Sequence, residues 1–382
     1  MELALYLHIP FCTKKCPYCD FYSVPEIPDE RLYLQALLKE IDLIKYHHEE
    51  LFSEGPPRIK TFYVGGGTPS LFSPIFYEKL LDKLIQTLLF QPIELSIEAN
   101  PESLTFEKAK GYKDLGFNRM SLGIQSFNPK GLEFLQRRHS LHEALLAIEN
   151  VHKAGFENIS FDLIYGWRGQ GVKTLQKELQ LALFLSPSHL SLYELTLYPK
   201  TPFFKKYSGL NFLREKRLLM LANLIENELL SNGYLHYEIS NYAKEGFECK
   251  HNLSYWKVEP YLGLGAGAVS RISKYRFKNP ESIRKYYEYI LDKGTLPVII
   301  TENLNSRELI KEKIFMNLRL TEGLNLSEIR GYSFRLKEEA LEKLCKKGLL
   351  SIDKDNLRLT PKGRFLHQRV VAYLWDNLEV MK

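Results

Sequence analysis

The sequence predicts an α/β fold, an open partial barrel of six strand and helix units followed by a mainly helical, winged-helix-like C-terminal domain. Two observations predict it. Six β-rich runs are each followed by a stretch with apolar residues at three- and four-residue spacings, and this alternation lapses beyond about residue 242. Such alternation gives parallel strands joined by right-handed crossovers, and six units fall short of the eight that close a TIM barrel.

The predicted elements of the barrel follow one another in regular order. The strands are residues 4–9, 61–64, 93–98, 119–125, 159–165 and 189–197. The helices that follow them are residues 30–50, 73–89, 106–115, 141–154, 175–185 and 214–230. We therefore assign residues 1–235 to the partial barrel.

Two further regions complete the predicted organisation. Residues 236–300 are rich in glycine and aromatic residues and contain a motif of the form H-N-x-x-Y-W at positions 251–256. Residues 301–382 predict helices at 306–320 and 336–349, a hairpin at 350–359 and a closing helix at 361–375 that begins with Pro361. This winged-helix-like unit carries too little positive charge to indicate DNA binding, so we expect it to cover the barrel or to dock a partner.

Composition and charge exclude several classes of protein. Hydrophobic residues make up 45% and charged residues 26%, which is typical of an ordinary globular chain. No apolar run approaches the roughly 20 residues of a membrane helix, and the first residues lack a basic leader, so we expect a cytoplasmic protein. A formal charge of +6 with interspersed signs does not indicate nucleic acid as a partner.

The strongest chemical signal is the segment Cys12-Thr-Lys-Lys-Cys16-Pro-Tyr-Cys19, which follows the first predicted strand. In a reducing compartment, a tight cluster of three cysteines favours metal chemistry over disulfides. Three thiolates can bind three irons of a [4Fe-4S] cluster and leave the fourth iron open to another ligand. A zinc site is the alternative, with His8 or Asp20 as an awkward fourth ligand.

The C-x3-C-x2-C spacing resembles the hallmark of the radical S-adenosylmethionine (SAM) superfamily. That resemblance implies that the open iron binds SAM, which electron transfer cleaves to a 5′-deoxyadenosyl radical. Longer blocks resemble one branch, the oxygen-independent coproporphyrinogen III oxidases and the related HemW haem chaperones. These blocks are Tyr6-Leu-His-Ile-Pro-Phe-Cys12, Gly65-Gly-Gly-Thr-Pro69, Glu98-Ala-Asn-Pro101, Ser121-Leu-Gly-Ile-Gln-Ser-Phe127, Asp162-Leu-Ile-Tyr-Gly166, Tyr237-Glu-Ile-Ser-Asn241 and His251-Asn-Leu-Ser-Tyr-Trp256.

The resemblance implies that the three cysteines ligate the cluster and that a set of residues at the carboxyl ends of the strands lines the SAM pocket. This set is Tyr6, Tyr18, Gly66, Gly67, Thr68, Glu98, Gln125, Arg137, Asp162 and Thr196. Barrel enzymes assemble their sites at this edge. The residues by themselves leave other interpretations open. The glycines could form a tight turn, Tyr6 could be a core residue, and Glu98 or Asp162 could pair with Arg119 or Arg137.

Departures from the oxidases favour the haem chaperones within this branch. The oxidases carry a further cysteine where this chain has Phe21, and they tend to have an extension before the first strand. The H-N-x-x-Y-W motif supports the same interpretation, with His251 as an axial haem ligand and Tyr255 and Trp256 as flat surfaces for the macrocycle. A packed histidine is the alternative for His251, and Cys249 is either a thiolate ligand or a small packed residue.

Two further positions differ from the usual family pattern. This chain has Gly166-Trp167-Arg168-Gly169 where the family usually reads G-L-P-G, and its glycine-rich segment ends Ala268-Val269 where a histidine often stands. If that histidine were a second haem ligand, the haem site of this chain would be weaker or differently ligated.

By this resemblance we expect a haem chaperone that binds haem and delivers it to membrane haemoproteins such as respiratory enzymes, with a [4Fe-4S] cluster and SAM. It would approach the membrane only while docked on its recipient, and a homodimer is compatible with the resemblance. The alternative is oxidative decarboxylation of coproporphyrinogen III, and a third class is radical modification of nucleic acid. The sequence assigns no catalytic residue.

Overall fold

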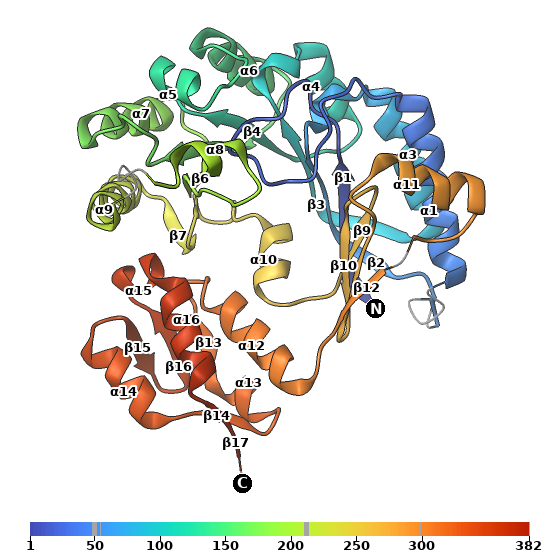
Figure 1. Ribbon diagram of the computed structural model, residues 1–382. Coiled ribbons are helices and arrows are strands. Elements are labelled where there is room, and N and C mark those ends of the chain that lie inside the picture. The colour runs from blue at the N-terminus through green and yellow to red at the C-terminus, as the bar shows by residue number, and fades with distance from the viewer. Residues whose placement is uncertain (48–51, 54, 210–213, 298, 382) are drawn as a thin grey trace.

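The protein is an α/β molecule built around one large sheet, with a smaller C-terminal domain beside it (Figure 1). The structure, a computed structural model, describes residues 1–47, 52–53, 55–209, 214–297 and 299–381. The strand order of the twelve-stranded sheet is β12-β11-β10-β9-β1-β2-β3-β4-β5-β6-β8-β7. Its central strands are parallel from β9 to β6 and are curved into an open barrel, whereas the strands at both ends are antiparallel. The predicted fold class is therefore confirmed.

Six strand and helix units form the barrel in the predicted order. The strands are β1 (Glu2–Ile9), β2 (Arg58–Gly66), β3 (Leu89–Ala99), β4 (Arg119–Gln125), β5 (Asn158–Tyr165) and β6 (His189–Glu194). The helices of the units are α1 (Glu30–His47), α3 (Pro74–Thr87), α4 (Phe106–Asp114), α6 (Leu141–Lys153), α7 (Val172–Phe184) and α9 (Glu215–Ser231). Short helices η1 (Pro69–Leu71), η2 (Pro101–Ser103), α5 (Pro129–Phe134) and α8 (Pro202–Tyr207) lie in the loops.

Local chemistry explains where these elements begin. The hydroxyl of Ser73 accepts from the backbone N–H of Phe76 and starts α3, and Ser140 with Glu143 forms a capping box that starts α6. Six of the seven residues of β4 are buried, as expected for a parallel strand covered on both faces.

Several boundaries differ from the prediction. The helix predicted at 73–89 ends at Thr87, and β3 begins at Leu89 because this residue pairs with Arg58 of β2. The strand predicted at 189–197 ends at Glu194. The closing helix predicted at 361–375 is divided at Leu366, whose φ of −102° and ψ of 21° depart from helical values. Residues 48–50 of the first predicted helix lie outside the described residues.

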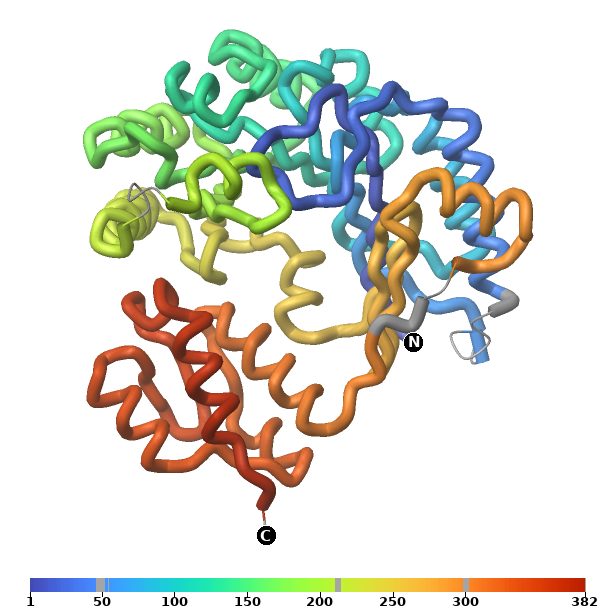
Figure 2. The backbone as a smooth tube through the Cα atoms, viewed as in Figure 1, coloured from blue at the N-terminus to red at the C-terminus, as the bar shows by residue number. Residues whose placement is uncertain are grey.

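The glycine-rich and aromatic region supplies strands at both edges of the sheet. Its elements are β7 (Leu235–Glu238), β8 (Asn241–Ala243), α10 (Lys250–Trp256), β9 (Tyr261–Leu264), β10 (Val269–Ile272), β11 (Tyr275–Lys278), α11 (Ile283–Tyr287), the π-helix η4 (Glu288–Lys293) and β12 (Ile299–Asn303). A Cβ on Gly263 would lie 2.3 Å from the carbonyl oxygen of Val269, so the tight β9-β10 connection requires glycine at that position. Figure 2 shows α10 in yellow between the barrel and the C-terminal domain.

The C-terminal domain has its own apolar core, which includes Ile314, Leu344 and Leu374. Its elements are α12 (Ser306–Asn317), β13 (Leu324–Asn325), α13 (Leu326–Arg330), β14 (Phe334–Leu336), α14 (Glu338–Lys346), β15 (Leu350–Asp353), β16 (Asn356–Leu359), α15 (Pro361–Phe365), α16 (His367–Asp376) and β17 (Leu378–Val380). Strands β15 and β16 form the predicted hairpin. Polar contacts join the domain to the barrel side, such as the 2.6 Å bond from Asn317 Nδ2 to the carbonyl of Trp256.

Within the described residues, no helix has both the length and the apolar character needed to cross a membrane.

Candidate functional site

The three clustered cysteines lie in a loop that leaves the carboxyl end of β1. Backbone bonds close the base of this loop, from Cys12 N to Val24 O at 2.9 Å and from Val24 N to Pro10 O at 2.7 Å. A tight turn inside the loop brings Cys19 N within 3.1 Å of Cys16 O. All three thiols are free, with Cys12 buried and Cys16 and Cys19 half-buried. The backbone therefore holds the three sulfurs in one compact segment at the rim of the barrel.

The glycine run at the end of β2 packs directly against this cysteine loop. A Cβ on Gly67 would lie 2.5 Å from the carbonyl oxygen of Phe11 and 2.9 Å from the sulfur of Cys12. A Cβ on Gly66 would lie 2.7 Å from the His8 ring, and Gly66 also has a φ of 116°. Gly67 requires glycine because a side chain would push the cysteine loop away from the sheet, and Gly66 requires it because of its φ and its contact with His8 of β1. In the structure, the backbone of the cysteine loop therefore closely approaches this glycine run.

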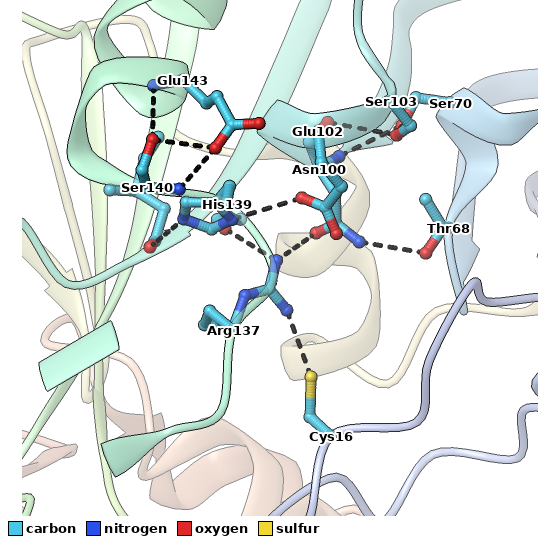
Figure 3. Close-up of polar contacts among 12 residues, drawn as sticks. Cys16, Thr68, Ser70, Asn100, Glu102, Ser103, Arg137, His139, Ser140 and Glu143 are labelled. Carbon is cyan, nitrogen blue, oxygen red and sulfur yellow. Dashed lines mark hydrogen bonds and ion pairs between the residues drawn. The ribbon is translucent and has the colours of Figure 1, made fainter. Parts of the chain in front are cut away.

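Arg137 connects the cysteine loop to the rim of the sheet (Figure 3). Its Nη1 donates to Cys16 Sγ at 3.4 Å, and its Nη2 donates to Asn100 Oδ1 at 2.7 Å and to Gly123 O at 3.1 Å. Asn100 Nδ2 in turn donates to the hydroxyl of Thr68 at 3.0 Å. Residues from three loops and from β4 are thus connected to one guanidinium group.

The chemistry of this donor set fits an anionic iron-sulfur cluster. Burial disfavours the charge of Arg137, yet the neighbouring Tyr18 and Cys16 hold the pKa of this arginine above its ordinary value. Its buried Nε has no hydrogen-bond partner among the described residues. Burial raises the pKa of the Cys12 thiol, and it raises the pKa of Cys19 to about 11. Without a group to stabilise them, the thiolates of Cys12 and Cys19 are disfavoured, and a bound metal would supply that stabilisation.

Within the described part of the chain, no three histidine, cysteine, aspartate or glutamate side chains converge as ligands of a single metal ion. A cubane does not require such convergence, because each thiolate binds a different iron of the cluster.

The two rim carboxylates accept hydrogen bonds from neutral groups. Glu98 accepts from the Tyr63 hydroxyl at 2.8 Å and from Gly66 N at 3.1 Å, and Asp162 accepts from the Ser121 hydroxyl at 3.0 Å. Burial raises the pKa of Glu98 to about 7, with Asp162 adding to the shift, and burial also raises the pKa of Asp162. Within the described residues, neither carboxylate forms the ion pair with Arg119 or Arg137 that was one interpretation of the sequence.

The remaining predicted pocket residues occupy different environments. Tyr6 is half-buried and bonds to His8 Nδ1 at 3.0 Å, and Tyr18 packs near Phe203, with ring centroids 6.1 Å apart. Gln125 ends β4 with a φ of 64°. Thr196 was expected in the sixth strand, but β6 ends at Glu194, so the Thr196 side chain is exposed and its hydroxyl donates to the Glu194 carbonyl at 3.2 Å.

His251 lies in the interior of the barrel, behind the rim. It is 0% exposed, and its Nδ1 and Nε2 each lie 2.8 Å from a hydroxyl, those of Thr61 and Tyr255. Its ring stacks on Tyr63, with centroids 5.1 Å apart and an interplanar angle of 26°. Burial, together with the charge of nearby Arg119, lowers the pKa of His251 to about 3. The imidazole is therefore neutral, and iron could reach neither nitrogen without breaking one of these bonds.

Cys249, the other alternative ligand near the motif, is fully buried. Burial raises the pKa of its thiol above the ordinary value, and the sulfur lies 3.5 Å from Glu94 Oε1. This environment is that of a small packed residue.

Sequence reasoning missed the residues that support the site. Asn100 follows β3 and links Thr68 to Arg137. His139 lies between Glu102 Oε2 at 3.2 Å and the Ile124 carbonyl at 3.1 Å, so both of its ring nitrogens face acceptors. Tyr63 donates its hydroxyl hydrogen bond to Glu98 and stacks its ring on His251. The Glu98-Ala-Asn-Pro101 block contained the signal for Asn100, whereas nothing in the sequence places His139 beside Glu102.

Comparison with known proteins agrees with this geometry. The family model described as the radical SAM superfamily matches residues 6–182, and the HemN C-terminal domain matches residues 304–366. The solved structure of coproporphyrinogen III oxidase (HemN) from Escherichia coli superposes with a TM-score of 0.80 at 22% identity, covering 98% of this chain and 90% of that one. That likeness concerns the fold. The fold and the cysteine loop are those of a radical SAM protein.

Curated relatives are similar over nearly their whole length. The haem chaperone HemW of Bacillus subtilis is 36% identical, covering 98% of this chain and 99% of the relative. The haem chaperone HemW of Lactococcus lactis is 34% identical, covering 98% and 97%. This chain belongs to the HemW haem chaperone family within the radical SAM superfamily.

Proposed function

We propose that this protein is a haem chaperone, which binds haem and delivers it to membrane haemoproteins such as respiratory enzymes. The observation that carries the proposal is the match, over 98% of the chain, to relatives that are themselves named haem chaperones. Phe21 supports it, because a side chain that is 68% exposed stands directly after the cysteine loop, where the oxidases of this branch carry a further cysteine.

The same proposal includes a [4Fe-4S] cluster and SAM at the rim of the barrel. Cys12, Cys16 and Cys19 would hold the cluster, and Arg137 would lie beside it through its contact with Cys16. Bound together, these groups supply reductive cleavage of SAM. The SAM pocket would be lined by Tyr6, Tyr18, Gly66, Gly67, Thr68, Glu98, Gln125, Arg137, Asp162 and Thr196. Of these, Thr68 and Arg137 are already held in one network through Asn100.

A haem titration of the anaerobically reconstituted protein tests the proposal. We expect a shift of the Soret band that weakens in His251→Ala. His251 would act either by binding iron after its two hydrogen bonds open or by supporting Tyr255, whose hydroxyl it contacts at 2.8 Å. A spectrum that does not change on addition of haem to either protein contradicts the proposal.

Coproporphyrinogen III oxidation is the competing function, favoured by the likeness of the fold to HemN. Incubation with coproporphyrinogen III, SAM and a reductant distinguishes the two. A haem chaperone yields no protoporphyrinogen, and formation of that product would replace the proposed function with the enzymatic one.

Delivery implies a cytoplasmic protein that approaches the membrane only while it is docked on its recipient, with no nucleic-acid partner. A homodimer is part of the same proposal. Mixing the haem-loaded protein with membranes that contain an apo-respiratory enzyme should transfer haem to the membrane fraction. Sedimentation of the SAM-bound protein should give twice the monomer mass.

A further inference from the structure

A small apolar cluster lies beside the cysteine loop and is separate from the main core of the barrel. Its buried members are Leu135, Ile164, Trp167, Leu195, Phe203 and Tyr207, and we call them the satellite cluster. Tyr18, which stands between Cys16 and Cys19 in the sequence, packs against this cluster. The cysteine segment is thus anchored on side chains that the core of the large sheet does not include.

Helix α8 (Pro202–Tyr207) lies against the cysteine loop, and Figure 2 shows it in yellow-green beside the dark blue segment that follows β1. The backbone N–H of Phe203 donates to the carbonyl of Pro17 at 3.0 Å. The Phe203 ring also packs on Tyr18, at an interplanar angle of 59°. Pro17 and Tyr18 are the two residues between Cys16 and Cys19, so Phe203 contacts the whole turn that connects these cysteines.

Phe203 is itself held by neighbouring rings and is only 1% exposed. Its ring centroid lies 5.2 Å from that of Phe134 on α5 and 5.1 Å from that of Tyr207 on α8. Tilted and edge-to-face pairs at such distances are favourable contacts between aromatic rings. Arg137 follows α5 and donates to Cys16 Sγ, so α5 and α8 support the cysteine loop through two separate connections.

The start of α8 is fixed by a buried hydroxyl. Thr201 Oγ1 donates to the Tyr198 carbonyl at 2.7 Å and accepts from Phe204 N at 3.3 Å, and Pro202 occupies the first turn. A helix of six residues is too short to be stable by itself, so packing determines where α8 lies. Loss of the Phe203 ring should therefore release α8 from the cysteine loop.

We propose that α8 is a clamp that holds the turn between Cys16 and Cys19 in the conformation that retains the cluster, with Phe203 as its positioning residue. The clamp rests on the iron-sulfur cluster of the proposed function and adds the element that keeps the cluster bound. Groups that support metal ligands from behind commonly change metal affinity by about 10- to 100-fold when they are removed. A turn that is already ordered also loses less conformational freedom when it binds its ligand.

Three variants test the clamp. Phe203→Ala removes the ring, Phe203→Leu keeps apolar bulk at the same position, and Phe184→Ala on α7 is the matched control, because Phe184 is 84% exposed. Each protein is reconstituted anaerobically and mixed with an excess of an iron chelator, and the loss of the visible cluster absorbance is timed. The electron paramagnetic resonance spectrum of the dithionite-reduced cluster reports its ligand geometry, and urea unfolding of the cluster-free proteins confirms folding.

We expect about tenfold faster cluster loss in Phe203→Ala, with an altered resonance spectrum, a smaller increase in Phe203→Leu and the wild-type rate in Phe184→Ala. The wild-type rate and spectrum in Phe203→Ala overturn the clamp and leave the proposed cluster standing. A wild-type protein that takes up no cluster overturns that part of the proposed function, and the clamp with it.

If Phe203→Ala does not fold, Thr201→Val decides by the same measurement. This variant keeps every aromatic ring and removes only the hydroxyl that fixes the start of α8. Cluster loss a few-fold faster than in the wild type supports the clamp, and an unchanged rate overturns it.

Discussion

The cysteine segment lies at the rim of the barrel, and His251 of the H-N-x-x-Y-W motif lies in its interior. These two regions differ in how many of their polar groups have hydrogen-bond partners within the protein. At the rim, the cysteine loop holds three thiols that form no disulfide, and the buried Nε of Arg137 has no partner among the described residues. In the interior, His251 uses both ring nitrogens and its backbone N–H in bonds to Thr61, Tyr255 and Glu94. A group that lacks partners in the protein is available to a ligand, whereas a satisfied group stabilises the fold.

This difference teaches that a recognisable motif does not define one role for all of its residues. In the proposed function the cysteines would form a binding site, whereas the contacts of His251 in the structure are those of a support for its neighbours Thr61 and Tyr255. Glu98 lies at the boundary, since Tyr63 donates to it and also stacks on His251. The following predictions test or sharpen this comparison.

The largest expected effect is on the cluster itself. Cys16→Ser should abolish the visible charge-transfer absorbance and the acid-labile sulfide after anaerobic reconstitution, because each thiolate holds a different iron. Cys345→Ser on α14 of the C-terminal domain is the matched control and should bind the cluster normally. The prediction is contradicted if Cys16→Ser retains its full sulfide content. It is also contradicted if the wild-type protein contains stoichiometric zinc in place of the cluster.

In the interior, His251→Ala should reduce the free energy of unfolding by about 3–5 kcal/mol. The substitution leaves a cavity against Tyr63 and two buried hydroxyls without a partner. Urea unfolding of the cluster-free protein measures the change. A loss below about 1 kcal/mol would contradict the supporting role, because surface substitutions already give such values.

Glu98 should make stability depend on pH. Its folded pKa of about 7 exceeds the ordinary value of 4.5 because burial disfavours the charge, so its stabilising contribution is present below pH 4.5 and is lost as the pH rises to about 7. Up to about 3 kcal/mol is lost in this window. Glu98→Gln should remove that part of the pH dependence. Urea unfolding of both proteins between pH 4.5 and 7 measures the change. If the free energy of unfolding falls equally with pH in both proteins, Glu98 does not titrate in this way.

Arg137→Ala should weaken SAM binding to the reconstituted protein by about tenfold to a hundredfold, as expected for loss of a buried charged hydrogen-bonding group worth about 1.5–3 kcal/mol. Arg137→Lys should recover only part of the affinity, because a lysine cannot contact Cys16, Asn100 and Gly123 together. Equilibrium dialysis with labelled SAM measures both. Equal affinity for SAM in all three proteins would show that Arg137 does not contribute to SAM binding.

The smallest effect on stability is expected for Phe21→Ala. The side chain is 68% exposed, so the free energy of unfolding should change by less than about 0.5 kcal/mol. Haem affinity should still fall a few-fold, because Phe21 lines a cavity together with Tyr255 and Trp256, the residues expected to offer flat surfaces to the macrocycle. Urea unfolding and Soret titration of the same preparation give the two values. An unchanged haem affinity would place the cargo away from the cysteine loop.

Much of the barrel could be predicted from local signals. Alternating strand and helix periods identified all six units, and in the structure local signals such as the Ser140 capping box fix the helix starts. The strands of the glycine-rich region escaped prediction because β7 to β11 have only three or four residues each, too short for a period to show. They form because the edges of the large sheet offer unpaired backbone groups.

The sequence by itself determined the cysteine loop, the glycines that pack against it and the family of the protein, because these depend on residue type and spacing along the chain. Only the tertiary structure decided that Arg137 reaches Cys16, that His139 faces Glu102, and that His251 is enclosed by Thr61, Tyr63 and Tyr255. Apart from Tyr255 and His251, the partners in each contact are 12 or more residues apart in the sequence. The curvature of the sheet brings them together. Hydrogen bonding and burial then determine which polar groups remain available for a ligand.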